Sequence, residues 1–227
     1  ILSGRKATIS TATKALQDQI AGKDLPFLAE HLGVPFTYAL LKGRSNYVCL
    51  SKLADSDERV ANEVQVFIGK KQDEGDETFL AERDDFDFEV SDKEWREVSA
   101  SGDECPGKSA CPMGEECFAE QAKERARLAD VTVVNHALFF TDLMVRNMTD
   151  GNVSMIGDYD VFVADEAHEL EDWATNTLGM RLSEASITSL ISKVRRATDD
   201  YSKDPEVSGR VGDLLVDLND ALKRAWR

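Results

Sequence analysis

The segment that decides the fold spans residues 160–168 and reads Asp-Val-Phe-Val-Ala-Asp-Glu-Ala-His. Its first five residues include an apolar run that predicts a buried strand. The strand leads directly into the tetrapeptide Asp165-Glu166-Ala167-His168. Side chains at the carboxyl end of a parallel strand emerge into the crevice where α/β proteins bind ligands. The segment therefore predicts an α/β fold with a functional site immediately after this strand.

The tetrapeptide has the residue types that nucleotide hydrolysis needs. Asp165 is placed to hold Mg²⁺ through water, because Mg²⁺ prefers oxygen ligands and dehydrates reluctantly. Glu166 is suited to orient or deprotonate the water that attacks a γ-phosphate. We expect His168 to couple the nucleotide site to neighbouring motifs. Acidic residues also favour helix N-termini simply as caps, but the strand before the tetrapeptide and the rest of the chain favour the catalytic interpretation.

The phosphate-binding loop that usually accompanies such a site is missing. That loop has the pattern Gly-x-x-x-x-Gly-Lys followed by Ser or Thr. The nearest candidate, Lys42-Gly43-Arg44-Ser45, lacks both the earlier glycine and the lysine after the glycine. We therefore expect the chain to be a fragment whose phosphate-binding loop lies upstream of Ile1, and we expect the fragment alone not to hydrolyse ATP.

Charge is distributed unevenly along the 227 residues, whose net charge is −16. Net negative charge alone argues against nucleic-acid binding, which requires clustered Lys and Arg. Residues 1–54, however, hold seven basic and three acidic groups, whereas residues 55–94 hold fifteen acidic and five basic groups. A local basic track is therefore compatible with the composition. We interpret the acidic residues 73–94 as a solvated loop or irregular insertion.

The composition also narrows the class of protein. Hydrophobic residues make up 42% and charged residues 31% of the chain, as in ordinary globular proteins. No apolar run approaches the roughly 20 residues of a membrane span, and no signal-peptide pattern opens the chain. We therefore expect a cytoplasmic protein, in which structural disulfides are rare.

The hydrophobic pattern predicts alternating strands and helices, with an inserted segment and a helical end. Strands are expected at residues 6–11, 35–41, 131–135 and 160–164. Helices are expected to begin after a cap at Thr13 and to cover residues 24–32, 57–72, 118–129, 137–146, 182–198 and 207–226. Residues 99–116 are rich in Gly, Pro and Cys and show no such pattern.

Four cysteines have the spacing C-x55-C-x5-C-x5-C: Cys49, Cys105, Cys111 and Cys117. Structural zinc sites usually contain a C-x2-C pair, which is absent here. Four thiolates, three of them in a loop rich in Pro and Gly, suit an iron–sulfur cluster better. Zinc, or reduced thiols packed as small apolar residues, remain the alternatives. Bound metal would supply folding energy, so we expect residues 70–116, with little core of their own, to be disordered without it.

Five segments together resemble the XPD/DinG family of superfamily 2 helicases, and most closely its bacterial DinG-like branch. They are ISTATKALQDQ (9–19), LLKGRSNYVC (40–49), the cysteine group (105–117), ADVTVVNHALFF (129–140) and VFVADEAHELED (161–172). They occur in the family's order and cover most of residues 5–172.

The resemblance implies a RecA-like first motor domain interrupted by an iron–sulfur domain and followed by a helical arch. We accordingly expect residues 1–41 and 129–172 to form the motor domain, residues 42–128 the iron–sulfur domain, and residues 173–227 the start of the arch. It also implies ATP-driven 5′→3′ unwinding by a bacterial, nucleoid-associated monomer that acts on single-stranded DNA and DNA junctions.

The same resemblance assigns roles to individual residues. Cys49, Cys105, Cys111 and Cys117 look like ligands of a [4Fe-4S] cluster, and Asp165 and Glu166 look like the carboxylates of the Mg²⁺–ATP site. DNA contacts are expected from Ser10, Thr11, Thr13, Lys42, Arg44, Asn46 and Tyr47. Hydroxyl and cationic groups suit phosphates, and an aromatic ring suits base stacking. Helix capping is an equal alternative for Thr13, a solvated loop is one for residues 42–47, and His136 is expected to be a satisfied core histidine.

Two other functions remain open. One is a non-enzymatic DNA-binding module stabilised by an iron–sulfur cluster or by zinc. The other is a redox or zinc protein without a nucleic-acid role, which the basic segment 40–49 disfavours. A phosphate-binding loop upstream in the parent gene would distinguish the helicase from the binding module.

Overall fold

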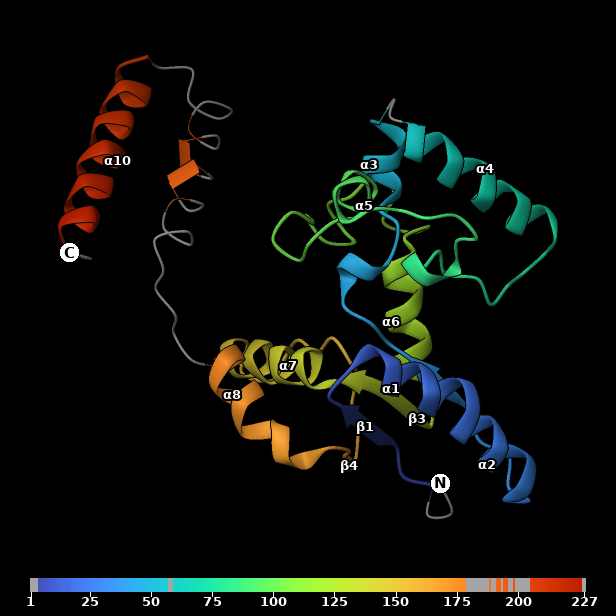
Figure 1. Cartoon of the computed structure of the whole chain (residues 1–227). Coiled ribbons are helices and arrows are strands. Elements are labelled where there is room, and N and C mark those ends of the chain that lie inside the picture. The colour runs from blue at the N-terminus through green and yellow to red at the C-terminus, as the bar shows by residue number, and fades with distance from the viewer. Residues whose placement is uncertain are drawn as a thin grey trace. The chain divides into compact units, whose positions relative to one another are not determined.

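A four-stranded parallel sheet with the order β2-β3-β1-β4 forms the base of the fold (Figure 1). The strands are β1 (Ala7–Thr11), β2 (Tyr38–Leu40), β3 (Val131–Asn135) and β4 (Val161–Ala164). β3 pairs with both β1 and β2, and β1 also pairs with β4. The predicted α/β class and all four expected strands are confirmed.

The structure is a computed structural model that describes residues 4–56, 59–178 and 205–225, with residues 188, 191–192, 194–195 and 198. It consists of two compact units, Ile1–Leu178 and Gly179–Arg227. In the second unit, helix α10 (Pro205–Ala225) confirms the helix expected at residues 207–226. The helix expected at 182–198 lies largely outside the described residues. None of the described helices is both long and apolar enough to cross a membrane.

Helices cover both faces of the sheet because the side chains of β3 alternate between two cores. Val131 and Val133 pack with Leu25 of α2 (Leu25–His31) on one face. Val134 belongs to the larger core on the other face, together with residues of α6 (Phe118–Leu128) and α7 (His136–Met148). On the first face α1 (Lys14–Gln19) continues through a π-helical turn, Ile20–Asp24, into α2. The result is a three-layer α/β/α arrangement.

Strand β4 is less buried than its apolar sequence predicts. Phe162 is 36% and Val163 45% exposed. Among the described residues β4 pairs only with β1 and forms an edge of the sheet. The expectation of a buried strand at 160–164 is therefore wrong for this arrangement, because burial on both sides requires a second neighbouring strand.

The segment between β2 and β3 builds its own helical layer on the sheet. It contains α3 (Leu50–Ala54), α4 (Arg59–Asp73) and α5 (Asp92–Val98), and α6 leads from it into β3 (Figure 1). Buried side chains from α4, α5 and α6 join the same core as Val134 and Phe139. The described residues of this segment are therefore continuous with the α/β fold through a shared hydrophobic core.

The acidic segment 73–94 is anchored by aromatic rings. Phe79, Phe86 and Phe88 each lie within 5.1–6.2 Å, centroid to centroid, of Phe67 on α4. Phe86 also packs at 6.1 Å from the ring of Trp95 on α5. A solvated loop is therefore wrong for the residues around Phe79 and Phe86, which form an irregular insertion with a core. Disorder of residues 70–116 without metal stays a prediction. The rings of these aromatic residues anchor the segment although it is rich in carboxylates.

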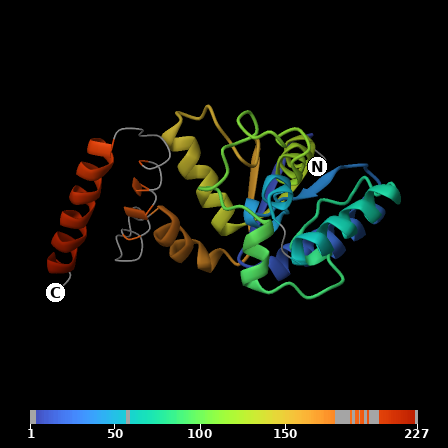
Figure 2. The same cartoon turned by 90° about the horizontal axis from the view of Figure 1, so that it is seen from above.

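Helix α8 (Leu170–Leu178) packs along α7 (Figure 2). It extends past residue 173, where we expected the arch to begin, and the first compact unit ends at Leu178.

The link from α7 to β4 is fastened by the fully buried Asp142. Its carboxylate accepts hydrogen bonds from Ser154 Oγ at 3.0 Å and from the backbone N–H of Ile156 at 3.3 Å, and it pairs with Arg146 Nε at 2.6 Å.

We predict that Asp142→Ala lowers the free energy of unfolding by about 2–4 kcal/mol, because it leaves buried donors without an acceptor. Chemical denaturation of the purified chain measures this loss. Asp158→Asn is the matched control, since Asp158 also pairs with Arg146 but its side chain is 99% exposed. Equal stability of the two variants would contradict the proposed role of Asp142.

Candidate functional site

The acidic tetrapeptide begins where β4 ends, at the carboxyl edge of the sheet. The register aligns Ser10 of β1 with Ala164 of β4. The backbone N–H of Asp165 then donates to the carbonyl oxygen of Ser10 at 2.8 Å. This bond extends the parallel pairing by one residue and fixes Asp165 beside the end of β1. Its half-buried carboxylate lies in the position from which ligands are held in α/β proteins.

Glu166 has a left-handed backbone conformation, with φ 51° and ψ 43°. Such conformations cost a non-glycine residue on the order of 1 kcal/mol or more and occur often at functional sites. The turn leads into the short helix Ala167–Glu169 and presents the Glu166 and His168 side chains to solvent. Glu166 Oε2 and His168 Nδ1 are 3.3 Å apart. The expected catalytic residues are therefore adjacent and accessible to a substrate.

His136 lies fully buried behind the tetrapeptide. Its Nδ1 is 2.7 Å from the hydroxyl of Ser10. Burial lowers the pKa of His136, whereas the backbone of Asp165 and the charge of Glu169 act in the opposite direction. Among the described residues its Nε2 has no hydrogen-bond partner. His136 is a core histidine, as expected, but only one of its ring nitrogens is satisfied.

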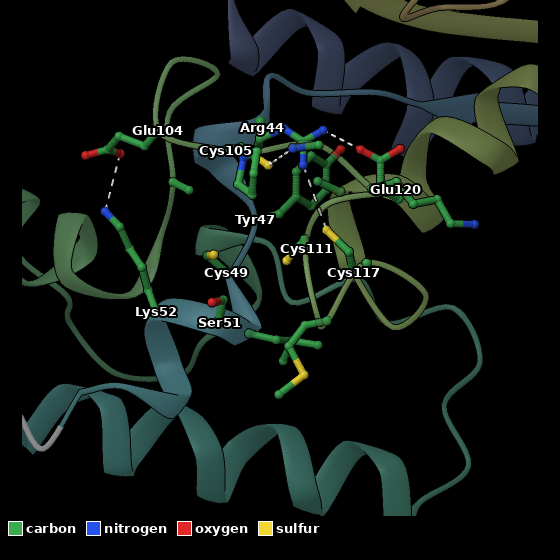
Figure 3. A pocket seen from close by; sticks show the side chains of 18 of the residues that line it. Arg44, Tyr47, Cys49, Ser51, Lys52, Glu104, Cys105, Cys111, Cys117 and Glu120 are labelled. Carbon is green, nitrogen blue, oxygen red and sulfur yellow. Dashed lines mark hydrogen bonds and ion pairs between the residues drawn. The ribbon is translucent and has the colours of Figure 1, made fainter. Parts of the chain in front are cut away.

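All four cysteines line one cavity of about 130 Å³ (Figure 3). Cys49 precedes α3, Cys117 precedes α6, and Cys105 and Cys111 lie in the irregular loop between α5 and α6. All four thiols are free and partly exposed. Spacing alone did not establish that these distant segments meet. The cavity therefore gathers thiols from two parts of the chain that are more than fifty residues apart.

The loop that carries Cys105 and Cys111 depends on two glycines. Gly107 has a φ of +88°, which glycine adopts readily, and its N–H lies 3.4 Å from Cys105 Sγ. A Cβ on Gly114 would lie 2.0 Å from the carbonyl oxygen of Lys108. The loop segments around Lys108 and Gly114 are therefore in backbone contact, and the space between them holds no side chain.

Arg44 lies along the same cavity. Its Nη1 is 3.9 Å from Cys117 Sγ, and its other terminal nitrogen pairs with the carboxylate of Glu120 (Figure 3). Burial would lower the pKa of Arg44, but the hydrogen bond to Glu120 and the charges of Cys105 and Cys117 raise it. The guanidinium of Arg44 is therefore held by Glu120 and Cys117 in the wall of the cavity.

Within the part of the chain that the structure describes, no three His, Cys, Asp or Glu side chains stand close enough together to hold a single metal ion. The cysteine thiols share a cavity without converging on one point.

Lys42 is buried in a cluster of three carboxylates. Its Nζ lies 2.8 Å from Glu82, 3.0 Å from Asp18 and 3.2 Å from Asp84. Burial would lower the pKa of Lys42, but hydrogen bonds and charges from Glu82 and Asp18 raise it well above its usual value. The side chain is 3% exposed. The ammonium group of Lys42 is thus occupied by carboxylates in this arrangement, and its contact with DNA phosphate stays a prediction.

The other expected DNA-binding residues differ in their access to solvent. Tyr47 is buried and accepts a hydrogen bond from the N–H of Lys42 at 2.9 Å, so its ring is not available to a base. Ser10 and Thr11 are fully buried at the end of β1. Thr13 is exposed and caps α1 by accepting from the N–H of Leu16 at 3.3 Å. Among these four residues, only Thr13 is exposed to an incoming phosphate.

An open groove of about 390 Å³ lies beside this segment. Its lining includes Arg44, Asn46, Lys123 of α6 and Asn135, which caps α7 by accepting from Leu138 N–H at 2.8 Å. Asn46 Nδ2 donates to the carbonyl of Gly43 at 2.8 Å.

The sequence did not predict the roles of Glu82, Asp84 and Glu120, because ion pairs between distant segments have no local signal.

We predict that Gly114→Ala disrupts the cysteine loop, since the added Cβ meets a backbone oxygen that cannot move without its chain. Amide hydrogen exchange of residues 105–117 should become faster. Gly102→Ala is the matched control, because a Cβ there has nothing within 4 Å. Unchanged exchange in the Gly114 variant would show that the loop is not packed in this way.

Comparison with known proteins gives the family. No protein-family model matches the chain. It is 35% identical, over 96% of its length, to the ATP-dependent helicase DinG of Mycobacterium tuberculosis, of which it covers 34%. It is 34% identical, over 93% of its length, to the ATP-dependent DNA helicase YoaA of Escherichia coli, again covering 34%. The 3′-5′ exonuclease DinG of Bacillus subtilis is 27% identical over 85% of the chain, which covers 20% of that protein.

These relatives do not favour a non-enzymatic DNA-binding module. The chain spans about a third of the length of the two helicases described above. It therefore belongs, as a segment, with the DinG-like helicases.

Proposed function

We propose that this chain forms the DEAH-box and cysteine-bearing part of an ATP-dependent DNA helicase. The observation that carries the proposal is that four cysteine thiols share one cavity in a chain whose DEAH tetrapeptide ends a parallel strand. The relationship to DinG and YoaA supports the same function. In this proposal the gene product unwinds DNA in the 5′→3′ direction, as a monomer, on single strands and junctions at the bacterial nucleoid.

Cys49, Cys105, Cys111 and Cys117 would hold a [4Fe-4S] cluster. The donor set fits, since four thiolates are the usual ligands of such a cluster. Each ligand binds a different iron, so the thiols need not converge on a single point. The Gly107 N–H near Cys105 and the guanidinium near Cys117 offer the hydrogen-bond donors that cluster sulfurs commonly accept. When bound, the cluster would cross-link the loop to the segment before α3 and add folding energy.

Asp165 and Glu166 would serve ATP hydrolysis. The half-buried Asp165 would hold Mg²⁺ through water. Glu166, exposed on its left-handed turn, would accept the proton of the water that attacks the γ-phosphorus, while the bond from that phosphorus to the bridging oxygen breaks and ADP leaves. His168, 3.3 Å from Glu166, would fix the orientation of that carboxylate.

Single-stranded DNA would follow the open groove between the Gly43–Asn46 segment and the start of α7. Free backbone amides at the first turn of α7 suit a phosphate, and Thr13 offers an exposed hydroxyl. Asn46 and Arg44 would contribute from the edge of the groove. Lys42 and Tyr47 would support this wall from within instead of touching the strand.

We predict about four iron and four acid-labile sulfide atoms per chain in protein purified without oxygen. Cys111→Ser should lower the iron content and the thermal stability, because it removes a ligand. Met113→Leu is the matched control, since Met113 lines the same cavity and the exchange conserves volume. Zinc in place of iron, or well-folded protein without metal, would contradict the cluster.

We predict that Glu166→Gln in the full-length gene product lowers kcat for ATP by about 10²–10⁴-fold with little change in KM, because the water loses its proton acceptor. DNA-stimulated phosphate release measures the effect. Glu171→Gln controls for the removal of an exposed acid nearby on α8. A kcat equal to that of the unmodified protein would remove Glu166 from the mechanism.

A further inference from the structure

A hydrogen-bonded path joins strand β1 to the back of the DEAH tetrapeptide. Ser10 makes two bonds at once: its hydroxyl meets His136 Nδ1 at 2.7 Å, and its carbonyl oxygen accepts the N–H of Asp165 at 2.8 Å. Both Ser10 and His136 are fully buried. Ser10 is therefore bonded both to Asp165, the first residue of the tetrapeptide, and to His136.

This path also reaches the exposed start of α1. Ser10 is followed by Thr11, the last residue of β1, and Thr13 then caps α1 at the surface. Two residues thus separate the buried hydroxyl of Ser10 from the exposed hydroxyl of Thr13. His136 itself begins α7, whose first turn lines the groove described above. The imidazole of His136 consequently lies where β1, the start of α7 and the tetrapeptide come together.

Packing alone does not explain a histidine at this position. A buried polar atom without a partner costs free energy on the order of 1–3 kcal/mol, and His136 Nε2 has no partner among the described residues. Nδ1 meets the Ser10 hydroxyl, and the backbone of Asp165 and Glu166 lies close enough to the ring to act on its pKa, although Nε2 completes no hydrogen bond in this arrangement. An apolar side chain of similar size would fill the same space without that cost.

We propose that His136 is a positioning residue that couples strand β1 to the DEAH turn, so that DNA contact near Thr13 is transmitted to Glu166. The proposal rests on the ATP hydrolysis proposed above. In it, the Nδ1 bond holds Ser10, and Ser10 holds Asp165 by its backbone. The free Nε2 gives the turn a partner when Glu166 moves into its hydrolytic position. The strained backbone of Glu166 is the element that moves.

Two variants separate this coupling from simple packing. His136→Phe fills the cavity and removes both nitrogens, whereas His136→Asn keeps a polar atom near the position of Nδ1. Thr132→Val is the matched control, because Thr132 is also buried on the sheet and its hydroxyl donates to the carbonyl of Ala126 at 2.9 Å, on another helix. Ser10→Ala completes a double-mutant cycle with His136→Phe.

The first measurement uses the chain itself. Amide exchange at Asp165 should become about tenfold faster in His136→Phe, be largely restored in His136→Asn, and stay unchanged in Thr132→Val. Ser10→Ala and His136→Phe should be non-additive. Variants that lose thermal stability while the Asp165 amide exchanges as in the unmodified chain would overturn the coupling.

The second measurement uses the full-length gene product. His136→Phe should lower kcat for ATP by about 100-fold with KM within about twofold, and should abolish stimulation by single-stranded DNA. Unaltered kcat and stimulation would overturn the proposal. If the unmodified gene product itself does not hydrolyse ATP, the proposed function is contradicted, and the amide exchange alone decides whether His136 fixes the turn.

Discussion

The ammonium group of Lys42, buried among three carboxylates, connects the parts of this fold. Asp18 comes from α1, Lys42 follows β2, and Glu82 and Asp84 belong to the acidic segment. A buried charge without partners is strongly destabilising. Separation of the acidic segment from Lys42 would therefore remove two of the three carboxylates that pair with the buried ammonium group.

The same interaction explains why the cysteine cavity and the DEAH turn belong to one structure. The N–H of Lys42 donates to the hydroxyl of Tyr47, and Tyr47 forms part of the cavity wall. Ser10 is in register with Val134, which belongs to the same core as Tyr47, and its carbonyl oxygen accepts the N–H of Asp165. The block of acidic residues, which has no role in the family resemblance, thus contributes to the interior: its rings pack on α4 and two of its carboxylates neutralise a lysine.

The local sequence pattern predicted the helices and strands but not the tertiary contacts between them. The β3 run was predicted with its exact bounds, and α4 and α6 within about two residues, because periodic apolar positions report a buried face directly. The short helices α3 and α5 and the anchoring by Phe79 and Phe86 were missed, since they depend on partners far away in the chain. Burial of Tyr47 and exposure of Val163 likewise follow from neighbours, which residue type does not specify. Four cysteines at one cavity were suggested by chemistry, yet only the fold brings Cys49 to the others.

The position of β3 has a consequence for how the chain is made. β3 lies between β2 and β1, yet it is synthesised after the whole segment 42–128. On the ribosome, β1 and β2 emerge without the strand that joins them, and their edges stay unpaired until about ninety residues later. The intervening helices have then already appeared and can begin to fold, as N-terminal parts do during translation. Closure of the sheet is thus a late, non-local event, and the period before it is when the nascent chain most needs protection from aggregation.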